Sequence, residues 1–513
     1  MAARNTEVLD RSDMQGLIMR GYKELRDARY YLLRIEDVDA FQRWLRTLLD
    51  EGRVTDSAQR PTDNGGALKQ TGALNLAFTN SGLKRLGVDP DPAAQQRDGF
   101  SLEFREGLIQ PSRSRILGDV GENDPKHWLW GGPTGRLSDT NIHCIALFFA
   151  EHPNDRESPN GSRPIVALWE QLAPRPEAAT VLHVLHAHIH QDFKEPFGFR
   201  DGISQPIIRF TKRDADFSGA DRELHVVEPG EFILGYENGH GRMPLSPSVL
   251  PERDPNHRLR ALESYPRLDR RLFRTDLRDF GRNGTYVVLR QLEQDVEGFA
   301  AFLQAKAGPE PRDQRQLAAK IVGRWHDGAP LATTPHEDPD GKPDNEFSYY
   351  ANDRYGHRCP LGAHIRRGNP RDTFSGEHGR ETSLKRVNLH RVLRRGRIYG
   401  PPYPPPDAHD DDRFAPSADQ VEGRGIMFMV INTDLRRQFE FVQQTWMNSD
   451  TFTGVSHEAD PLVGARCRAF TIQQAEGNVR VDGLHRFVTV RGGAYLFMPG
   501  LAALRCLADP IPA

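Results

Sequence analysis

The sequence predicts an α+β fold, in which strands and helices are mixed without the regular alternation of a βα barrel. In both halves of the chain, short apolar segments typical of strands lie among segments with helical spacing. Hydrophobic residues make up 37% of the 513 residues and charged residues 27%, which permits a large core and argues against extended disorder. The length alone suggests about three domains, but a boundary near residue 220 gives two halves of similar content.

The first half is expected to contain three strands and three helices. Strands are predicted where β-branched, aromatic and aliphatic residues cluster. Helices are predicted where such residues recur every three or four positions, and Pro176 suits the first turn of one of them. Asn80 or Ser81 could cap another. The expected strands are 30–35, 74–78 and 142–150, and the expected helices are 38–49, 79–87 and 176–185.

The second half repeats this mixture. Its most apolar strand is expected at 425–432, and an amphipathic helix is expected to follow it. A sheet covered by helices on one face would bury both the apolar strand and the apolar face of the helix. The expected strands are 231–236, 284–290 and 425–432, with a strand or hairpin at 487–498, and the expected helices are 296–307, 311–322 and 434–446.

Charge and composition exclude several classes of protein. The net charge of −3 lacks the basic excess of a nucleic-acid binder or of a protein drawn to membranes by positive charge. The longest apolar run, 142–150, falls far short of the roughly 20 residues that span a bilayer. Four cysteines with no CxxC pair, and no apolar stretch of a secretory signal near the N-terminus, favour a cytoplasmic location.

Several familiar motifs are missing from the sequence. It has no GxGxxG after a strand, no GxxxxGK[ST] and no GxSxG, which argues against nicotinamide, P-loop and serine-hydrolase chemistry. Four histidines, His183, His186, His188 and His190, lie close together and could bind a transition metal. A solvated or hydrogen-bonded group of histidines is the default explanation.

Three segments carry more specific signals. Asp201 lies between Gly198 and Gly202 in an apolar loop, where it could shuttle a proton or form an Asx turn. His364 is followed by Arg366, Arg367 and Arg371, a pattern that suits an iron ligand beside acidic groups or a core histidine beside a basic run. Arg394 shares a strand face with Val392, so it either needs an anionic partner or lies on a solvated basic strand.

Together these segments resemble the dye-decolorizing peroxidase (DyP) family of haem enzymes, and in particular its larger class. The family's GxxDG signature matches 198–202, its proximal segment matches 359–372, and its distal-arginine segment matches 393–400. The resemblance extends over nearly the whole chain. It implies two ferredoxin-like halves, 1–220 and 221–513, with haem bound between a sheet and helices.

The resemblance also implies one haem b per chain. We expect it to be held non-covalently, because the sequence has no CxxCH. Each expected site residue is carried over from a matching position in the family's motifs or placed beside one. His364 would ligate the iron, Asp434 would accept a hydrogen bond from His364, Arg367 would bind a haem propionate, Ile203 would wall the pocket, and Asp201 and Arg394 would be the catalytic acid–base and charge-stabilising residues.

The expected activity is the reduction of hydrogen peroxide, coupled to one-electron oxidation of bulky aromatic donors such as dyes and phenolics. Because the ordinary pKa of an aspartate is about 3.9, an Asp201 shuttle predicts an acidic optimum. The alternatives are a haem-binding protein that handles haem iron without efficient turnover, a silent family member that binds a partner, and a non-haem metalloprotein. No nucleic-acid or membrane partner is expected, and a monomer and a homodimer remain open.

Overall fold

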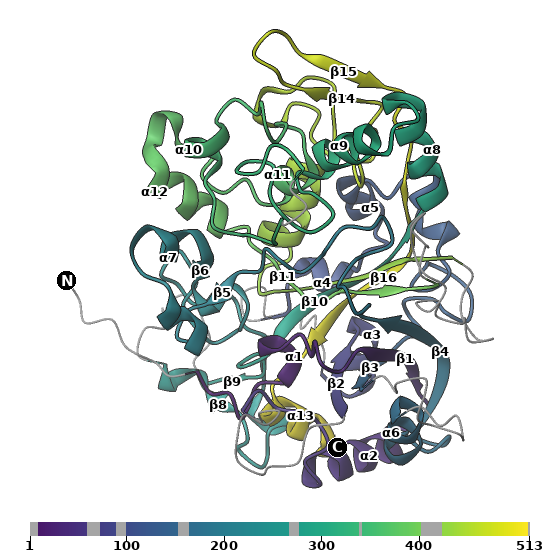
Figure 1. The fold of residues 1–513 in the computed structure, drawn as a ribbon. Coiled ribbons are helices and arrows are strands. Elements are labelled where there is room, and N and C mark those ends of the chain that lie inside the picture. Colours follow the sequence, from purple (N-terminus) through teal and green to yellow (C-terminus); the bar gives the residue numbers. More distant parts are fainter. Residues whose placement is uncertain are drawn as a thin grey trace.

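The fold is built on one antiparallel sheet whose strand pairing closes into a ring. The computed structural model describes residues 9–58, 72–88, 99–151, 164–265, 276–337, 341–401 and 423–510. Pairing runs in the order β10-β16-β2-β3-β1-β4-β12-β13, and β13 pairs with β10 again to close the ring. In Figure 1, β1 to β4 lie below β10, β11 and β16. The short strand β11 adds a further pairing to β13.

The bounds of the elements follow the chain from end to end. The strands of the ring are β1 (Asp27–Ile35), β2 (Gly72–Phe78), β3 (Cys144–Ala150), β4 (Ala179–His188), β10 (Thr285–Gln294), β11 (Leu393–Arg394), β12 (Arg397–Tyr399), β13 (Gly425–Asn432) and β16 (Val488–Met498). The other strands are β5 (Ile207–Ile208), β6 (Val226–Val227), β7 (Ser248–Val249), β8 (Arg260–Ala261), β9 (Arg278–Asp279), β14 (Ala469–Ile472) and β15 (Val479–Asp482). The helices are α1 (Gly16–Met19), α2 (Val38–Asp50), α3 (Asn80–Arg85), α4 (Leu102–Glu106), α5 (Pro111–Leu117), α6 (Pro164–Leu172), α7 (Gly219–His225), α8 (Val296–Ala307), α9 (Pro311–Val322), α10 (Tyr349–Asp353), α11 (His364–Gly368), α12 (Ser375–Asn388) and α13 (Leu501–Ala508).

The ring consists of two sets of four strands with the same internal order. In the first set the order is β2-β3-β1-β4 and in the second it is β12-β13-β10-β16, so each set by chain order is strand 2, 3, 1 and 4. Both sets therefore have the ferredoxin-like arrangement that the sequence predicts. The two sets join through single residue pairs, Phe497 with Phe78 and Ile398 with His188. The predicted boundary near residue 220 falls in α7, between the two sets, and stays a prediction.

Strand alternation divides the core into an inner and an outer part. Side chains of one parity, such as Leu147, Leu289 and Met429, come together from both sets of strands in one buried cluster. Side chains of the other parity, such as Phe78 and Phe497, belong to a second cluster that includes the covering helices. Because successive side chains of a strand point to opposite faces, the two clusters lie on the two faces of the ring.

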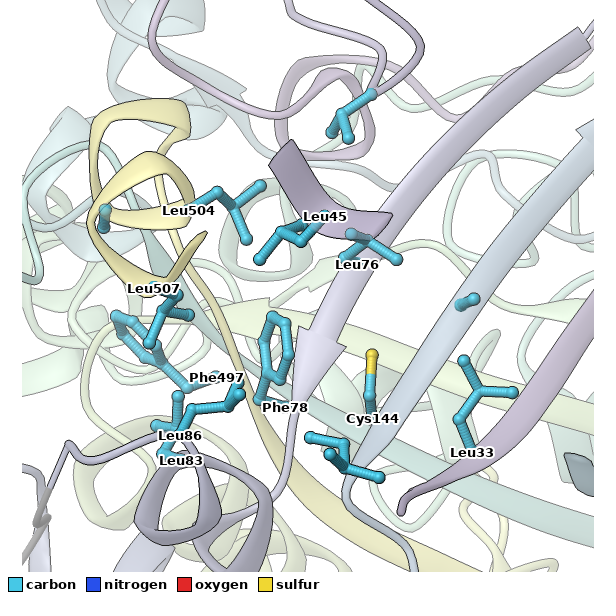
Figure 2. Packing of buried hydrophobic residues seen from close by; sticks show 14 of the residues in the cluster. Leu33, Leu45, Leu76, Phe78, Leu83, Leu86, Cys144, Phe497, Leu504 and Leu507 are labelled. Carbon is cyan, nitrogen blue, oxygen red and sulfur yellow. The ribbon is translucent and has the colours of Figure 1, made fainter. Parts of the chain in front are cut away.

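Helices α2 and α13 cover part of the outer face. Asp37 caps α2 by accepting a hydrogen bond from the amide of Ala40, which fixes where the helix begins. Figure 2 shows Leu45 of α2 and Leu504 and Leu507 of α13 packed against β2 and β16. This packing ties the C-terminal helix to strands of the first half.

Most predicted elements are present. The helices at 296–307 and 311–322 and the strand at 425–432 have the predicted bounds, and the strands predicted at 30–35, 74–78, 142–150 and 284–290 lie within or overlap β1, β2, β3 and β10. The predicted helix at 38–49 is α2, and α3 follows 74–78 with Thr79 as its capping residue in place of Asn80 or Ser81. The segment 487–498 forms the single strand β16 and no hairpin.

Two predicted elements are wrong in type, and a third is a helix with a different winding. The helix predicted at 176–185 is the strand β4, because its β-branched residues pair with β1 along nine residues. The strand predicted at 231–236 is a buried turn that begins at Pro229, so its apolar residues reflect burial without strand pairing. The helix predicted at 434–446 is π-helical over Arg436–Glu440 and Val442–Met447, a winding often found beside functional sites. None of the described helices is long and apolar enough to cross a bilayer.

Removing the side chain of Leu504 tests the packing of α13 on the ring. Leu504 is fully buried, so Leu504→Ala should lower the free energy of unfolding by about 2–5 kcal/mol, through lost burial and the cavity left behind. Chemical denaturation followed by circular dichroism measures the change. Leu102, which is 41% exposed, provides the control, and Leu102→Ala should cost less than about 0.5 kcal/mol. Equal effects of the two substitutions would contradict this packing.

Candidate active site

The candidate active site is a cavity of about 300 Å³ on the outer face of the second set of strands. Leu292 of β10, Phe428 of β13 and Val490 of β16 form its floor. Val322 of α9 and Met447 of the π-helical segment contribute to its other walls, together with residues of α11. The cavity therefore lies between a sheet and helices, as the sequence predicts for its cofactor.

His364 is the first residue of α11 and lines this cavity. Its Nδ1 atom lies 3.0 Å from Oδ2 of Asp460, a carboxylate with no exposed surface. Asp460 also accepts hydrogen bonds from the backbone amides of Leu462 (3.0 Å) and Val463 (2.9 Å), which fix its position. The pair leaves Nε2 of His364 without a hydrogen-bond partner among the described residues and available to a ligand in the cavity.

Two opposing effects set the protonation of this pair. Burial favours the neutral imidazole, but the charge and hydrogen bond of Asp460 outweigh it and raise the pKa of His364. Burial likewise favours a neutral Asp460, but His364 and the Val463 amide outweigh it and lower the pKa of this carboxyl. The imidazole therefore stays close to a fixed negative charge, which orients the ring and makes Nε2 a stronger donor to a metal.

The structure corrects the prediction that Asp434 accepts the hydrogen bond from His364. Asp434 follows β13, where its carboxylate accepts hydrogen bonds from the backbone amide (2.9 Å) and Nε (3.3 Å) of Arg437. It caps the start of the π-helical segment and is 42% exposed. The sequence places Asp434 at the end of an apolar strand, but the fold brings Asp460, 96 residues after His364, to the imidazole.

Asp201 and Arg394 form an ion pair on another wall of the same cavity. Nη1 of Arg394, on β11, lies 2.9 Å from Oδ1 of Asp201. Asp201 is 43% exposed, and its exposed surface faces the cavities that it lines. Burial raises the pKa of Asp201, but Arg394 outweighs it, so the net shift is below the ordinary value of 3.8. Asp201 is therefore a carboxylate over nearly the whole pH range.

The glycines of the GxxDG segment are required by the backbone. Gly198 has φ +91° and Gly202 has φ +77°, values that side-chain-bearing residues rarely adopt. The Asp201 amide donates to the carbonyl of Phe193 at 3.0 Å, which closes the loop that presents the carboxylate. The loop geometry explains why one aspartate lies between two glycines at this position.

Strand parity decides which apolar residues line the cavity. Ile203 lines it, as the sequence predicts for a wall residue. From β13, Ile426 and Phe428 face the cavity, whereas Met427 and Met429 point into the inner cluster. One strand therefore serves the core with one face and the site with the other.

Comparisons with known proteins find similar sequences. The multifunctional dye peroxidase DyP2 of Amycolatopsis sp. is 30% identical over 364 residues, which cover 67% of this chain and 68% of that protein. The dye-decolorizing peroxidase msp1 of Mycetinis scorodonius is 26% identical over 537 residues, which cover 98% of this chain and 88% of that protein. The chain belongs to the dye-decolorizing peroxidase family. It is accordingly a DyP-type peroxidase.

The known structures of this family share the fold. A dye-decolorizing peroxidase in complex with 2,6-dimethoxyphenol has a TM-score of 0.68 and 22% identity, covering 98% of this chain and 100% of that one. An ancestral D-type dye-decolorizing peroxidase has a TM-score of 0.69 and 22% identity, over 97% and 99% of the two chains. No family model matches the chain.

Membership in the DyP family implies a haem cofactor, and the charges of the cavity fit it. Arg324, Arg371 and Arg391 line the cavity, and none of them pairs with a carboxylate of the described residues. Burial, together with repulsion from Arg371 and Arg394, lowers the pKa of Arg391 to about 9. Clustered buried cations need an anionic partner, and the two carboxylates of haem would provide one beside an imidazole that is free to bind iron.

The structure also corrects the prediction that Arg367 binds a propionate. Arg367 is fully buried and lies outside the lining of the cavity. Its guanidinium donates to the carbonyls of Gly362, Trp446, Ser449 and Glu458, so it holds α11 against the π-helical segment. In the helix at 364–368, Arg367 faces away from the cavity, and Arg371 beyond the helix faces into it.

Glu195 and Gln294 are polar residues of the cavity that the sequence-based prediction lacks. Glu195 accepts hydrogen bonds from Nε2 of Gln294 (2.6 Å) and from the amides of Phe197 and Phe199. Burial outweighs these bonds and raises the pKa of Glu195 to about 7. Glu195 lies three residues before the GxxDG motif, which is a possible signal, whereas Gln294 and Asp460 carry no signal in the sequence.

The histidines of 183–190 form no metal site in the structure. His183, His186 and His188 lie on β4, and Nδ1 of His190 lies 2.6 Å from Oδ1 of Asp192. Within the described ranges, no three histidine, cysteine or carboxylate side chains are grouped so that they could hold a metal ion. This arrangement counts against the non-haem metalloprotein alternative.

Replacing Asp460 tests the His364–Asp460 pair. In the cofactor-free protein, Asp460→Asn should lower the pKa of His364, because burial is then no longer opposed by a negative charge. Nuclear magnetic resonance titration of the imidazole measures the shift. The matched control, Asp434→Asn, should leave the His364 pKa unchanged. A larger change in the Asp434 variant would show that the structure assigns the wrong carboxylate.

Proposed function

We propose that this DyP-type peroxidase uses one non-covalently bound haem b per chain to reduce hydrogen peroxide and to oxidise bulky aromatic donors by one-electron steps. One observation carries the proposal. A single cavity between a sheet and helices is lined by an imidazole that pairs with a buried carboxylate and by an aspartate that pairs with an arginine. The first pair suits an iron ligand, and the second suits the handling of a proton.

On the iron side, the residues of the chain bind and orient the cofactor. Nε2 of His364 would hold the iron, while Asp460 accepts from Nδ1 and keeps the ring in the required tautomer. Arg371 and Arg391 would hold the two carboxylates of the cofactor. Their positive charges, which no described carboxylate neutralises, support this role.

Asp201 and Arg394, on another wall of the same cavity, would act on peroxide. Bound haem supplies the iron at which the oxygen–oxygen bond is cleaved and the electrons of the donors are received. Asp201 takes a proton from the inner peroxide oxygen and returns it to the outer one, as a general acid–base does. Arg394 stabilises negative charge on the departing oxygen and keeps Asp201 ionised until it receives the proton.

The donors are proposed to be bulky dyes and phenolics. The relatives named as dye peroxidases support this class of donor. A family member whose structure contains 2,6-dimethoxyphenol supports a methoxyphenol as the first donor to test.

Absorption spectroscopy and dye oxidation together test the proposal. The haem-reconstituted protein should show a Soret band and should oxidise an anthraquinone dye when peroxide is added. His364→Ala should abolish haem retention, because it removes the iron ligand. Asp201→Asn should retain haem while slowing the reaction with peroxide by about 10²–10⁴-fold.

The results distinguish this function from the alternative. A protein that handles haem iron has no need of Asp201 and Arg394, and it should show a Soret band without dye oxidation at any pH. A protein with no Soret band after reconstitution would rule out both functions.

The pH dependence tests the role of Arg394. Asp201 must be ionised to accept a proton, and its pKa is lowered, so the rate with peroxide should fall only as the pH drops below the ordinary value of 3.8. In Arg394→Gln the pKa of Asp201 should rise, because the largest effect that opposes burial is removed, and the acid limb should move to higher pH. Rapid-mixing kinetics between about pH 3 and pH 7 measure the limb. An unmoved limb, or a wild-type rate that rises only above pH 7, would contradict the role of Asp201.

A further inference from the structure

The segment that carries Asp201 is a short hairpin, 193–201, whose two arms pair through the backbone. The amide of Asp201 donates to the carbonyl of Phe193 (3.0 Å), and nearer the tip the amide of Glu195 donates to the carbonyl of Phe199 (2.9 Å). An isolated antiparallel bridge lies between these two bonds. Because the arms are paired, the position of the tip determines the position of Asp201.

The carboxylate of Glu195 bridges the turn at the tip. It accepts hydrogen bonds from the amides of Phe197 (3.1 Å) and Phe199 (2.9 Å). The backbone carbonyl of Glu195 accepts from the amide of Gly198 (2.7 Å). Buried backbone amides need acceptors, so this one residue satisfies most of the turn.

Gln294 ties the tip to the ring of strands. Its Nε2 atom donates to Glu195 at 2.6 Å. Gln294 is a buried residue at the end of β10, a strand that pairs with both β13 and β16. The hairpin itself belongs to none of the strands of the ring, so this bond anchors the loop of Asp201 to a rigid element.

Two aromatic contacts hold the same tip against other elements. Phe197 packs on Phe299 of α8 with ring centroids 4.8 Å apart, and Phe199 stacks on the ring of His326 at 4.2 Å. The carbonyl of His326, which follows α9, also accepts from the amide of Arg200 at 3.1 Å. The tip is thus packed against β10, α8 and the segment after α9, with Glu195 as its polar centre.

Glu195 is neutral at acidic pH. Burial, with a smaller contribution from the charge of Asp201, outweighs the hydrogen bonds and raises the pKa of Glu195 to about 7. Among the other groups near the tip, burial lowers the pKa of His326 to about 4, and Arg394 pairs with Asp201. Phe299 of α8 carries no charge.

Gln294 can hold Glu195 in either protonation state. Oε1 of Gln294 is buried and has no hydrogen-bond partner among the described residues. A half-turn of this amide would present Oε1 to the hydroxyl of a protonated Glu195, just as Nε2 is presented to the carboxylate. The anchor therefore works on both sides of the pKa of Glu195.

We propose that Glu195 is a positioning residue for the reaction with peroxide. With Gln294 it fixes the tip of the hairpin and thereby the place of Asp201 beside Arg394, with which it lines the haem cavity. A general acid–base must lie within hydrogen-bond reach of the proton that it transfers, so a small displacement is costly. This inference rests on the proposed peroxidase function and adds a residue on which its acid–base depends.

Two substitutions test the anchor from its two ends in the haem-loaded protein. Glu195→Gln keeps the size of the side chain but replaces one acceptor oxygen by a donor that faces another N–H group. Gln294→Leu removes the bond from β10 without changing any charge. Each variant should retain haem and should react with peroxide about 10–100-fold more slowly than the wild type.

The control removes a carboxylate elsewhere. Glu310, at the start of α9, is exposed and lies outside the lining of the haem cavity. Glu310→Gln should change the rate with peroxide less than about twofold. A rate equal to that of the wild type in Glu195→Gln or in Gln294→Leu would overturn the inference.

The acid limb of the peroxide rate distinguishes positioning from other effects. If Asp201 is displaced from Arg394, its pKa rises, so in both anchor variants the limb should move to higher pH. Loss of a negative charge at Glu195 would move the limb to lower pH, and general destabilisation would leave it unmoved. A limb that is unmoved or moved to lower pH would count against positioning and overturn the inference.

Hydrogen–deuterium exchange separates this inference from the peroxidase function. The amides of 193–201 should exchange faster in Glu195→Gln and Gln294→Leu than in the wild type and the control, because the hairpin opens more often. Faster exchange in a protein that does not react with peroxide would support the anchor and overturn only the peroxidase proposal. Equal exchange in all four proteins overturns the inference, whatever the activity.

Discussion

Arg371 and Arg391 hold positive charge inside the haem cavity, with no carboxylate of the described residues to neutralise it. Their burial is costly unless an anion enters, and repulsion between them adds to the cost. The architecture around them follows from this constraint. The sheet and the helices leave a cavity between them, and His364 lines that cavity with one nitrogen oriented by Asp460.

The ring of strands makes this space possible without weakening the core. Residues of one parity from both sets fill the interior of the ring, so the outer face of the second set is free to form the floor of a cavity. Met429 fills the interior of the ring of strands, and its neighbour Phe428 forms part of the floor of the cavity. Arg394 lies on β11, which pairs with β13, so the catalytic arginine and the floor of the cavity depend on the same sheet.

The sequence predicts the parts of the site that lie within short motifs. Asp201 between two glycines and His364 before a run of arginines are local patterns, and the structure brings both, with Arg394, to one cavity. The α+β fold and most strands also follow from local patterning. The partner of His364 does not, because Asp460 reaches it from 96 residues away through packing that no periodicity encodes.

Two other wrong predictions, Arg367 as the propionate ligand and a helix at 176–185, have the same origin. Arg367 and Arg371 belong to one basic run, and only the end of a five-residue helix determines that Arg371 enters the cavity while Arg367 holds the backbone. The helix predicted at 176–185 is a strand because β1 is there to pair with it. In each case the deciding contact is made by a distant part of the chain.

A crystal structure of the haem-reconstituted protein tests the central claim most directly. We expect iron bonded to Nε2 of His364 and the two carboxylates of the cofactor against Arg371 and Arg391. Asp201 and Arg394 should lie on the face of the haem opposite His364. Iron bonded to another residue, or haem bound away from this cavity, would contradict the assignment of the site.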